Sequence, residues 1–176
     1  AKKLGIAYYD KNIISQIAEK SGLSPEYIQE NAELSPKKGL FAYAFAGRDI
    51  TGKSVEDMVY EAQRKVILEL AGKEPCVIVG RNADYILKDR DDCLKIYIYA
   101  PFDVRTKHIA EKYDMSMFSA KRLVRQMDEK RDTYYKYVTG NRRGEHDGKD
   151  AMFDSSIMGV DGTVDMLLEM INKKFG

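Results

Sequence analysis

Apolar residues recur at helical spacing in several segments of this chain, and short continuous apolar runs separate those segments. The clearest helical pattern covers residues 54–72, where the inward-facing stripe consists of Val55, Met58, Val59, Ala62, Val66, Ile67 and Leu70. The same criteria predict shorter helices that begin at Asp10, Ser24, Asn82, Asp103, Ser119 and Gly162. Asp10 is the expected N-cap of the first of these helices.

Four extended segments are predicted at residues 6–9, 76–80, 94–99 and 152–157, the last as a short strand or turn. Residues 76–80 form a short apolar run between turn signals, which is typical of a strand buried on both faces of a parallel sheet. Strands separated by helices of this length indicate βαβ units. We therefore expect one α/β domain with a parallel sheet. The polar, glycine-containing residues 138–149 are its expected mobile loop.

The composition of the 176 residues suits one ordinary globular domain, with 44% apolar and 32% charged residues. The net charge of +1 gives no general attraction to nucleic acid or anionic membrane, so any anion site must be local. Two cysteines and two histidines, far apart in the sequence, predict neither a disulfide framework nor a metal site. No apolar stretch is long enough to span a bilayer, and we expect a cytoplasmic protein without a membrane partner.

Two arginines stand out as candidate anion ligands. Arg81 follows a predicted buried strand and a glycine, where open α/β sheets bind ligands, although a salt bridge to Asp84 or Asp89 would also explain it. Arg131 lies in the basic residues 121–143, a kind of stretch that usually forms a solvated helix face. Three nearby tyrosines either stack on a base or pack in the interior: Tyr134, Tyr135 and Tyr137.

Four motifs occur in order: the Tyr9-Asp10 pair, the strand and Gly80-Arg81 turn, the strand and arginine-bearing helices of residues 97–135, and the final strand at residues 153–157. Together they resemble the cytidylate-kinase-like branch of the nucleoside monophosphate kinases over nearly the whole chain. The resemblance implies a three-layer α/β/α fold of the P-loop kinase type. It also implies a monophosphate-binding insertion at about residues 24–72 and a lid at about residues 128–150.

Members of this family carry a glycine-rich phosphate loop between their first strand and first helix. This sequence begins beyond that point, so we expect the central first strand and its loop to lie upstream of Ala1. The 176-residue chain by itself would then be inactive.

The resemblance implies transfer of the γ-phosphate of ATP to a nucleoside monophosphate, with CMP as the acceptor and Mg²⁺ accompanying the co-substrate ATP. Arg81 would grip the acceptor phosphate, and Arg131 would neutralise charge in the transition state as the lid closes. Further substrate-binding candidates are Tyr9, Asp10, Arg125 and Lys130. Candidates for the ATP side are Arg142 and Asp154, although Asp154 also suits an ordinary strand end.

Residues 47–54 match the phosphate-loop pattern of two glycines four residues apart followed by lysine and serine. In that interpretation Lys53 reaches the transferred phosphate and Ser54 holds Mg²⁺. The alternative is a surface loop in which Ser54 is an ordinary N-cap. We favour the surface loop, because the family resemblance places these residues inside the monophosphate-binding insertion.

Two other functions compete with the kinase. Asn82 stands where cytidylate kinases commonly carry aspartate after the Gly-Arg pair, which favours a catalytically inactive nucleotide-binding or regulatory relative. The basic residues 121–143 could form a nucleic-acid-binding module, but the near-neutral net charge counts against it. The acceptor base and the oligomeric state stay open, a homo-oligomer included.

Overall fold

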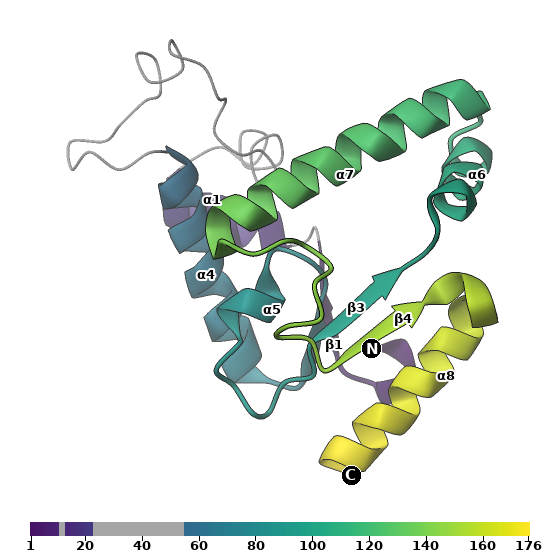
Figure 1. Cartoon of the computed structure of the whole chain (residues 1–176). Helices are drawn as coiled ribbons and strands as arrows, with labels where there is room; N and C mark the ends of the chain where they lie inside the picture. The colour runs from purple at the N-terminus through teal and green to yellow at the C-terminus, as the bar shows by residue number, and fades with distance from the viewer. Residues whose placement is uncertain (11–12, 23–54) are drawn as a thin grey trace.

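The computed structural model describes residues 1–10, 13–22 and 55–176 (Figure 1). The helical elements there are η1 (Lys2–Leu4), α1 (Ile14–Ser21), α4 (Val55–Lys73), α5 (Ala83–Ile86), α6 (Phe102–Lys112), α7 (Met117–Thr139) and α8 (Ser155–Phe175). The strands are β1 (Ala7–Tyr9), β2 (Cys76–Ile78), β3 (Ile96–Tyr99) and β4 (Ala151–Asp154). The helix predicted from Ser24, the phosphate-loop match at residues 47–54, with Lys53 and Ser54, and most of the predicted insertion lie outside the described residues.

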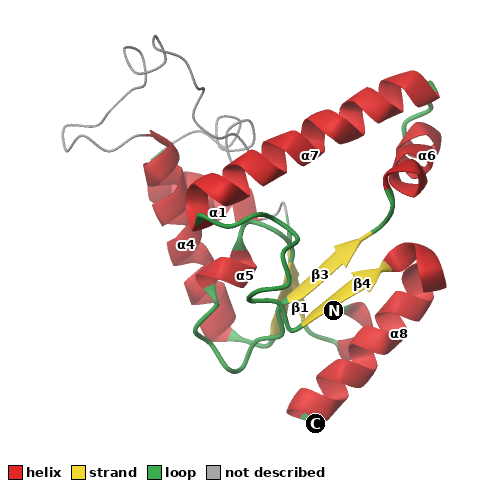
Figure 2. Cartoon of the chain, viewed as in Figure 1, coloured by secondary structure: helices red, strands yellow, loops and turns green. Residues whose placement is uncertain are grey.

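The strands form two separate parallel pairs (Figure 2). β1 pairs with β2, with Ala7 opposite Cys76, and β3 pairs with β4, with Ile96 opposite Ala151. The parallel pairing confirms the α/β fold that the alternation of strands and helices predicted. Within the described residues, however, the two pairs do not join into the continuous sheet of a three-layer fold.

β2 is less buried than its apolar sequence predicts. Its three residues are all half-buried, and Val79 just beyond it is 43% exposed. The expectation of a strand buried on both faces is therefore wrong for the described structure. In a two-stranded sheet each strand has a single neighbour, so fewer elements cover its faces and edges.

The core lies where α1 and α4 pack together beside α5 and the β1–β2 pair (Figure 1). The stripe predicted for residues 54–72 forms its largest part, and the buried members are Val59, Ala62, Val66, Ile67 and Leu70. Ile13 and Ile17 of the first helical segment are fully buried against it. The helical periodicity therefore identified the core correctly, because side chains three and four positions apart share one face of a helix.

The helices predicted from Asp10 and Ser119 have different N-caps in the structure. The N-cap of α1 is Ile13 and not Asp10, whose backbone carbonyl accepts the Ile13 N–H at 3.4 Å. The N-cap of α7 is Ser116 and not Ser119, because the Ser116 Oγ accepts the Ser119 N–H at 3.2 Å. The Ser116 hydroxyl thus satisfies one of the N–H groups that are unpaired at a helix start, whereas the Asp10 carbonyl closes a turn just before α1.

α7 is longer than predicted and runs from α6 to the region of α1 and α4 (Figure 1). At its far end the Tyr137 hydroxyl donates to the Asp57 carboxylate of α4 at 2.9 Å. The helix continues past Thr133 because no glycine or proline interrupts it before Gly140, which ends it with a left-handed φ of 77°. Val138 and Thr139, predicted to be in a loop, are therefore helical.

α8 starts at Ser155, earlier than the predicted start at Gly162. Asp154 at the end of β4 caps it by accepting the Ser156 N–H at 2.9 Å and the Ser156 hydroxyl at 2.6 Å. The helix bends sharply at Gly159, whose φ of 67° and ψ of −172° are not helical. Among the described helices, none is both long and apolar enough to cross a membrane.

Candidate functional site

The turn after β2 has an unusual backbone. Gly80, Arg81 and Asn82 have φ angles of 69°, 57° and 52°, so three successive residues occupy the left-handed region. For a residue other than glycine this region costs roughly 1–2 kcal/mol, with asparagine among the more tolerant types. The surrounding structure must supply contacts that hold such a turn, and backbone strain of this kind concentrates at binding sites.

Buried polar side chains surround this turn. Gln63 of α4 is fully buried. Asn82 in the turn is 8% exposed, and Tyr134 of α7 is 5% exposed. The Gln63 Nε2 donates to the Arg81 carbonyl at 2.8 Å. Four buried atoms of this cluster have no hydrogen-bond partner among the described residues: Gln63 Oε1, Arg81 Nη1, Asn82 Nδ2 and the Tyr134 hydroxyl.

Unpaired buried polar atoms are rare in folded proteins, where roughly nine in ten or more have a partner. Of the four here, Arg81 Nη1, Asn82 Nδ2 and the Tyr134 hydroxyl can each donate a hydrogen bond. A guanidinium group with an amide and a hydroxyl beside it is a donor set that suits an oxyanion such as a phosphate. The cluster lies just past the carboxyl end of β2, where parallel sheets bind ligands.

Burial raises the pKa of Tyr134 to about 12. The charged Arg81 side chain and the Gln63 amide both act to lower the pKa of Tyr134. The hydroxyl nevertheless has no hydrogen-bond partner of good geometry among the described residues. The Tyr134 hydroxyl is therefore neutral and able to donate throughout the physiological pH range.

This raised pKa predicts an alkaline loss of stability that Tyr134→Phe abolishes. The unfolded pKa is about 10, so the folded state loses stability as the pH rises from about 10 towards 12, by about 1.4 kcal/mol at about pH 11. Urea denaturation of wild type and Tyr134→Phe at about pH 8 and about pH 11 measures it. At the lower pH the free energy of unfolding of the variant should equal or exceed that of wild type. At the higher pH the difference in favour of the variant should be larger by about 1.4 kcal/mol. Tyr113→Phe, at a tyrosine that is 56% exposed, is the control and should show no gain.

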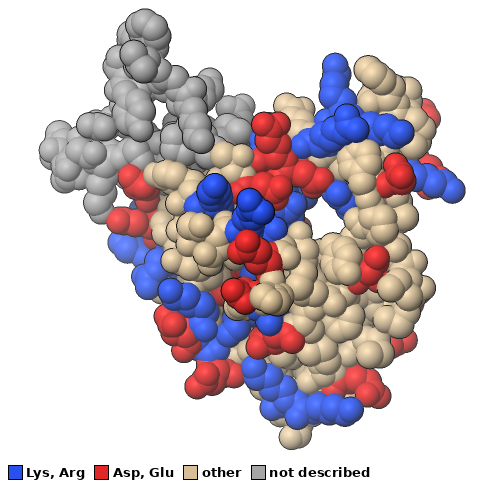
Figure 3. Space-filling view, in the orientation of Figure 1, with Lys and Arg blue, Asp and Glu red and all other residues tan. Residues whose placement is uncertain are grey.

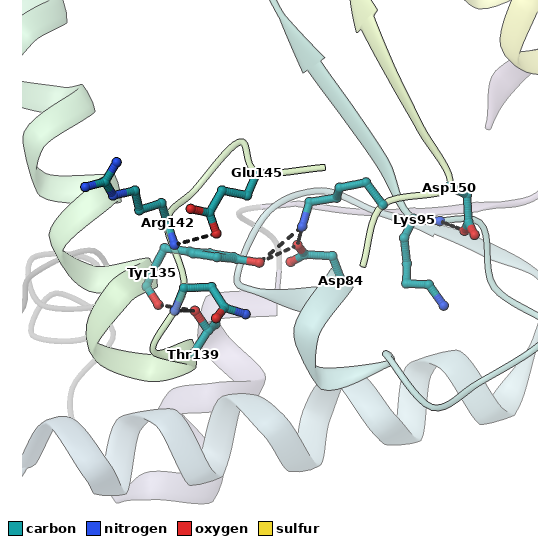
Figure 4. Close-up of polar contacts among 9 residues, drawn as sticks. Asp84, Lys95, Tyr135, Thr139, Arg142, Glu145 and Asp150 are labelled. Carbon is teal, nitrogen blue, oxygen red and sulfur yellow. Dashed lines mark hydrogen bonds and ion pairs between the residues drawn. The ribbon is translucent and has the colours of Figure 1, made fainter. Parts of the chain in front are cut away.

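Tyr135, the neighbour of Tyr134 on α7, is held by a different network (Figure 4). Its hydroxyl donates to the Asp84 Oδ2 at 3.1 Å, and the Lys149 Nζ lies 2.5 Å from the same oxygen and 3.1 Å from the hydroxyl. The Lys149 side chain is 6% exposed and that of Asp84 is 23% exposed. This network joins α5, α7 and the segment before β4.

A mobile loop was predicted at residues 138–149, but the segment that follows α7, residues 140–150, is anchored at both ends. The Arg143 guanidinium pairs with Asp132 at 2.7 Å and with Asp128 at 3.5 Å. Asp150 accepts the Lys95 N–H at 2.6 Å through its carboxylate and donates its own N–H to the Lys95 carbonyl at 2.8 Å (Figure 4). These bonds continue the pairing of β3 with β4 and hold the segment across the site.

A groove of about 450 Å³ lies between α6 and α7, lined by Phe102, Arg125, Asp128, Glu129, Asp132 and Thr133. The Arg125 guanidinium lies 5.3 Å from the centre of the Phe102 ring. Arg105 of α6 pairs with Asp128 of α7 at 2.9 Å. An aromatic ring with a guanidinium group over it can stack a planar base, and the carboxylates can accept hydrogen bonds from amino groups.

Three of the predicted site residues lie on α7. Arg131 is exposed there, three and four residues before the buried Tyr134 and Tyr135. Arg125 lines the groove and Lys130 is half-buried on the same helix.

Other predicted site residues lie elsewhere or have structural partners. The Tyr9 hydroxyl donates to Glu74 at 2.8 Å, back towards the amino end of β2, and the Asp10 carboxylate accepts the Tyr8 hydroxyl at 3.3 Å. Arg142 is exposed, with its N–H donating to Glu145 at 3.4 Å (Figure 4). Asp154 caps α8. Their roles in binding stay predictions.

Sequence reasoning did not find the polar residues that hold the site, namely Gln63, Asp128, Arg143 and Lys149. One signal was present, because Gln63 is a polar residue within the apolar stripe of residues 54–72. For the charged residues there was none, since each lies in a polar stretch that reads equally well as a solvated surface.

Comparison with known proteins concerns the fold and the family of this chain. A crystal structure of an uncharacterized protein from Eubacterium ventriosum ATCC 27560 shares the fold, with a TM-score of 0.70 and 21% sequence identity over 98% of this chain and 86% of that one. No curated protein matches the chain. The sequence model of one family matches residues 1–157, and the chain therefore belongs to the cytidylate kinase-like family.

Proposed function

We propose that this protein is a nucleotide-binding phosphotransferase that moves the γ-phosphate of ATP to a nucleoside monophosphate, with CMP as the acceptor. Membership of the cytidylate kinase-like family supports the reaction class. The observation that carries the proposal is the Arg81 turn, where a buried guanidinium nitrogen has no hydrogen-bond partner among the described residues, and neither has the nearby Tyr134 hydroxyl or the Nδ2 of the next residue, Asn82. Such a set is suited to the phosphate of the acceptor.

In this reaction the protein acts mainly by positioning the two nucleotides and by neutralising charge that spreads over the transferred phosphoryl group. Arg81 binds the acceptor phosphate. Arg131, on the helix whose Tyr134 lies near Arg81, stabilises the transition state, and Arg125 and Lys130 add positive charge along the same helix. Mg²⁺ enters with ATP as part of the co-substrate. Asp10 and Tyr9 contact the acceptor nucleoside, for which Tyr9 must release Glu74.

The first test is binding of CMP and of cytidine to the 176-residue chain by isothermal titration calorimetry. We expect CMP to bind more tightly than cytidine, and Arg81→Ala to weaken CMP binding by about 10- to 100-fold, the effect of losing charge-assisted hydrogen bonds. Arg90→Ala is the control, because Arg90 pairs with Asp92 at the surface, and it should bind CMP like wild type. Equal binding of CMP and cytidine by wild type would disprove the phosphate role of Arg81.

Catalysis needs a second measurement, the formation of ADP from ATP–Mg²⁺ and CMP. Turnover by the 176-residue chain would assign the phosphate loop to residues 47–54. Turnover by the complete gene product alone would instead support a loop upstream. CMP binding with no turnover by the complete gene product would select the catalytically inactive relative. Asn82, which stands where cytidylate kinases commonly carry aspartate, is the residue that makes this outcome worth testing.

The nucleic-acid-binding alternative finds less support. Figure 3 shows Lys and Arg interspersed with Asp and Glu on the face that it presents. Within residues 121–143, Arg143 is neutralised by Asp132 and Asp128, and Arg105 of α6 also pairs with Asp128. A surface of mixed charge offers no continuous path for a phosphate backbone.

A further inference from the structure

Gln63 is a polar side chain where the helix pattern calls for an apolar one. It lies on the inward face of α4 between Ala62 and Val66 and is fully buried. Its Nε2 donates one hydrogen bond to the Arg81 carbonyl, but its Oε1 has no partner among the described residues. A buried acceptor left unpaired costs about 1–3 kcal/mol, which offsets the roughly 0.5–1.5 kcal/mol that the bond to the Arg81 carbonyl contributes. The specific consequence of a glutamine here is the fixed position of the Arg81 carbonyl.

The bond from Gln63 acts on the strained part of the turn. The Arg81 carbonyl belongs to the peptide group that links Arg81 to Asn82, both of which have left-handed φ angles. If either residue relaxed to an ordinary conformation, this peptide plane would rotate and its oxygen would leave Gln63. The hydrogen bond is thus made in the strained conformation and opposes its relaxation.

The neighbouring carbonyls are held differently. Gly80 accepts the backbone N–H of Ala83 at 3.1 Å, and Asn82 accepts those of Tyr85 and Ile86 at 3.0 and 2.9 Å. These are the ordinary bonds of a turn leading into α5. The Arg81 carbonyl accepts instead from a side chain of another helix, so α4 sets the orientation of this one peptide group.

We infer that Gln63 is a positioning residue: it holds the Arg81–Asn82 peptide in its left-handed conformation and so keeps the Arg81 guanidinium beside Tyr134 and directed at the acceptor phosphate. This inference rests on the proposed function, because the phosphate is the ligand that Arg81 is held to bind. Gln63 itself touches no substrate. Gln63 affects the binding of the phosphate group only, and the nucleoside part of the acceptor binds independently of Gln63.

The test uses two variants of Gln63 that should both weaken CMP binding, each for a different physical reason. Gln63→Leu removes the donor to the Arg81 carbonyl and leaves an apolar side chain of similar size. Gln63→Glu keeps the shape, but its carboxylate cannot donate and it attracts the Arg81 guanidinium. Gln16→Leu, at an exposed glutamine of α1, is the matched control. CMP and cytidine binding are measured by calorimetry, folding by urea denaturation, and the Arg81 φ from a crystal structure of Gln63→Leu.

We expect both Gln63 variants to fold, to bind CMP at least about 10-fold more weakly than wild type, and to bind cytidine unchanged. In Gln63→Leu the Arg81 φ should leave the left-handed region, and the control should behave like wild type. CMP binding by Gln63→Leu at the wild-type level, or an unchanged Arg81 φ, would overturn the positioning role while leaving the proposed function intact. Equal loss of CMP and cytidine binding, or failure of both variants to fold, would show a merely structural role and also overturn it. A wild-type chain that bound no CMP would refute the proposed function itself, and the inference with it.

Discussion

Replacing Arg131 with alanine is expected to lower the kcat of the complete gene product by about 10³-fold or more. An arginine that stabilises the transferring phosphoryl group contributes about 10³ to 10⁵ in rate, because positive charge placed at that group offsets charge that develops only in the transition state. Arg131 is exposed on α7, and its removal should therefore leave folding unchanged. The loss should appear in kcat more than in the KM for CMP.

Steady-state ADP formation measures this effect, with Arg122→Ala as the control at another exposed arginine of α7. Arg131→Lys should recover part of the rate, because lysine restores the charge without the planar pair of donors. Near-normal turnover of Arg131→Ala would remove Arg131 from the mechanism. A matching loss in Arg122→Ala would show that the effect reports the charge of the helix and not one residue.

Replacing Asp84 with asparagine is expected to destabilise the fold by about 3 kcal/mol, the lower end of the range for breaking a buried ion pair. The reason is that the Lys149 ammonium, 6% exposed, would stay buried without its carboxylate. Lys149→Met should cost less, because the Asp84 carboxylate is 23% exposed and can be hydrated. The double variant should recover much of the loss caused by Asp84→Asn.

Urea denaturation near neutral pH measures these differences. Burial lowers the pKa of Lys149, but the hydrogen bonds to Asp84 and Tyr135 outweigh it, so the pKa is raised above its ordinary value. A raised folded pKa means that this stabilisation is fully present below about pH 10.4 and is lost only as the pH rises through the folded value. A cost of Asp84→Asn that is no larger than that of Lys149→Met would contradict the assignment of Lys149 as the buried partner.

The two adjacent tyrosines of α7 connect this network to the proposed site. The Tyr134 side chain lies near Arg81. The Tyr135 hydroxyl donates a hydrogen bond to Asp84, which follows Arg81 by three residues. α7 therefore contacts both the Arg81 turn, through Tyr134, and the following helix α5, through Tyr135. The same helix carries Arg131, so these contacts set where Arg131 lies relative to Arg81.

The sequence by itself determined the parts that depend on local periodicity. The stripe of residues 54–72 predicted α4 and most of the core, because burial of one helix face requires apolar residues three and four positions apart. The alternation of strands and helices predicted parallel pairing, which β1 and β2 show. The site at the end of β2 stays a prediction, made from the position of Arg81 after a strand and a glycine. These features need no knowledge of distant residues.

Tertiary structure alone decided which polar residues meet. Gln63 and Arg81 are 18 residues apart, and Asp84 and Lys149 are 65 apart, so no spacing rule connects them. The same holds for the left-handed conformation of Arg81, which costs energy in isolation and persists through contacts from other helices. Local patterns record which face of an element is buried. The choice of partner within that face depends on how the elements pack, which is a property of the whole fold.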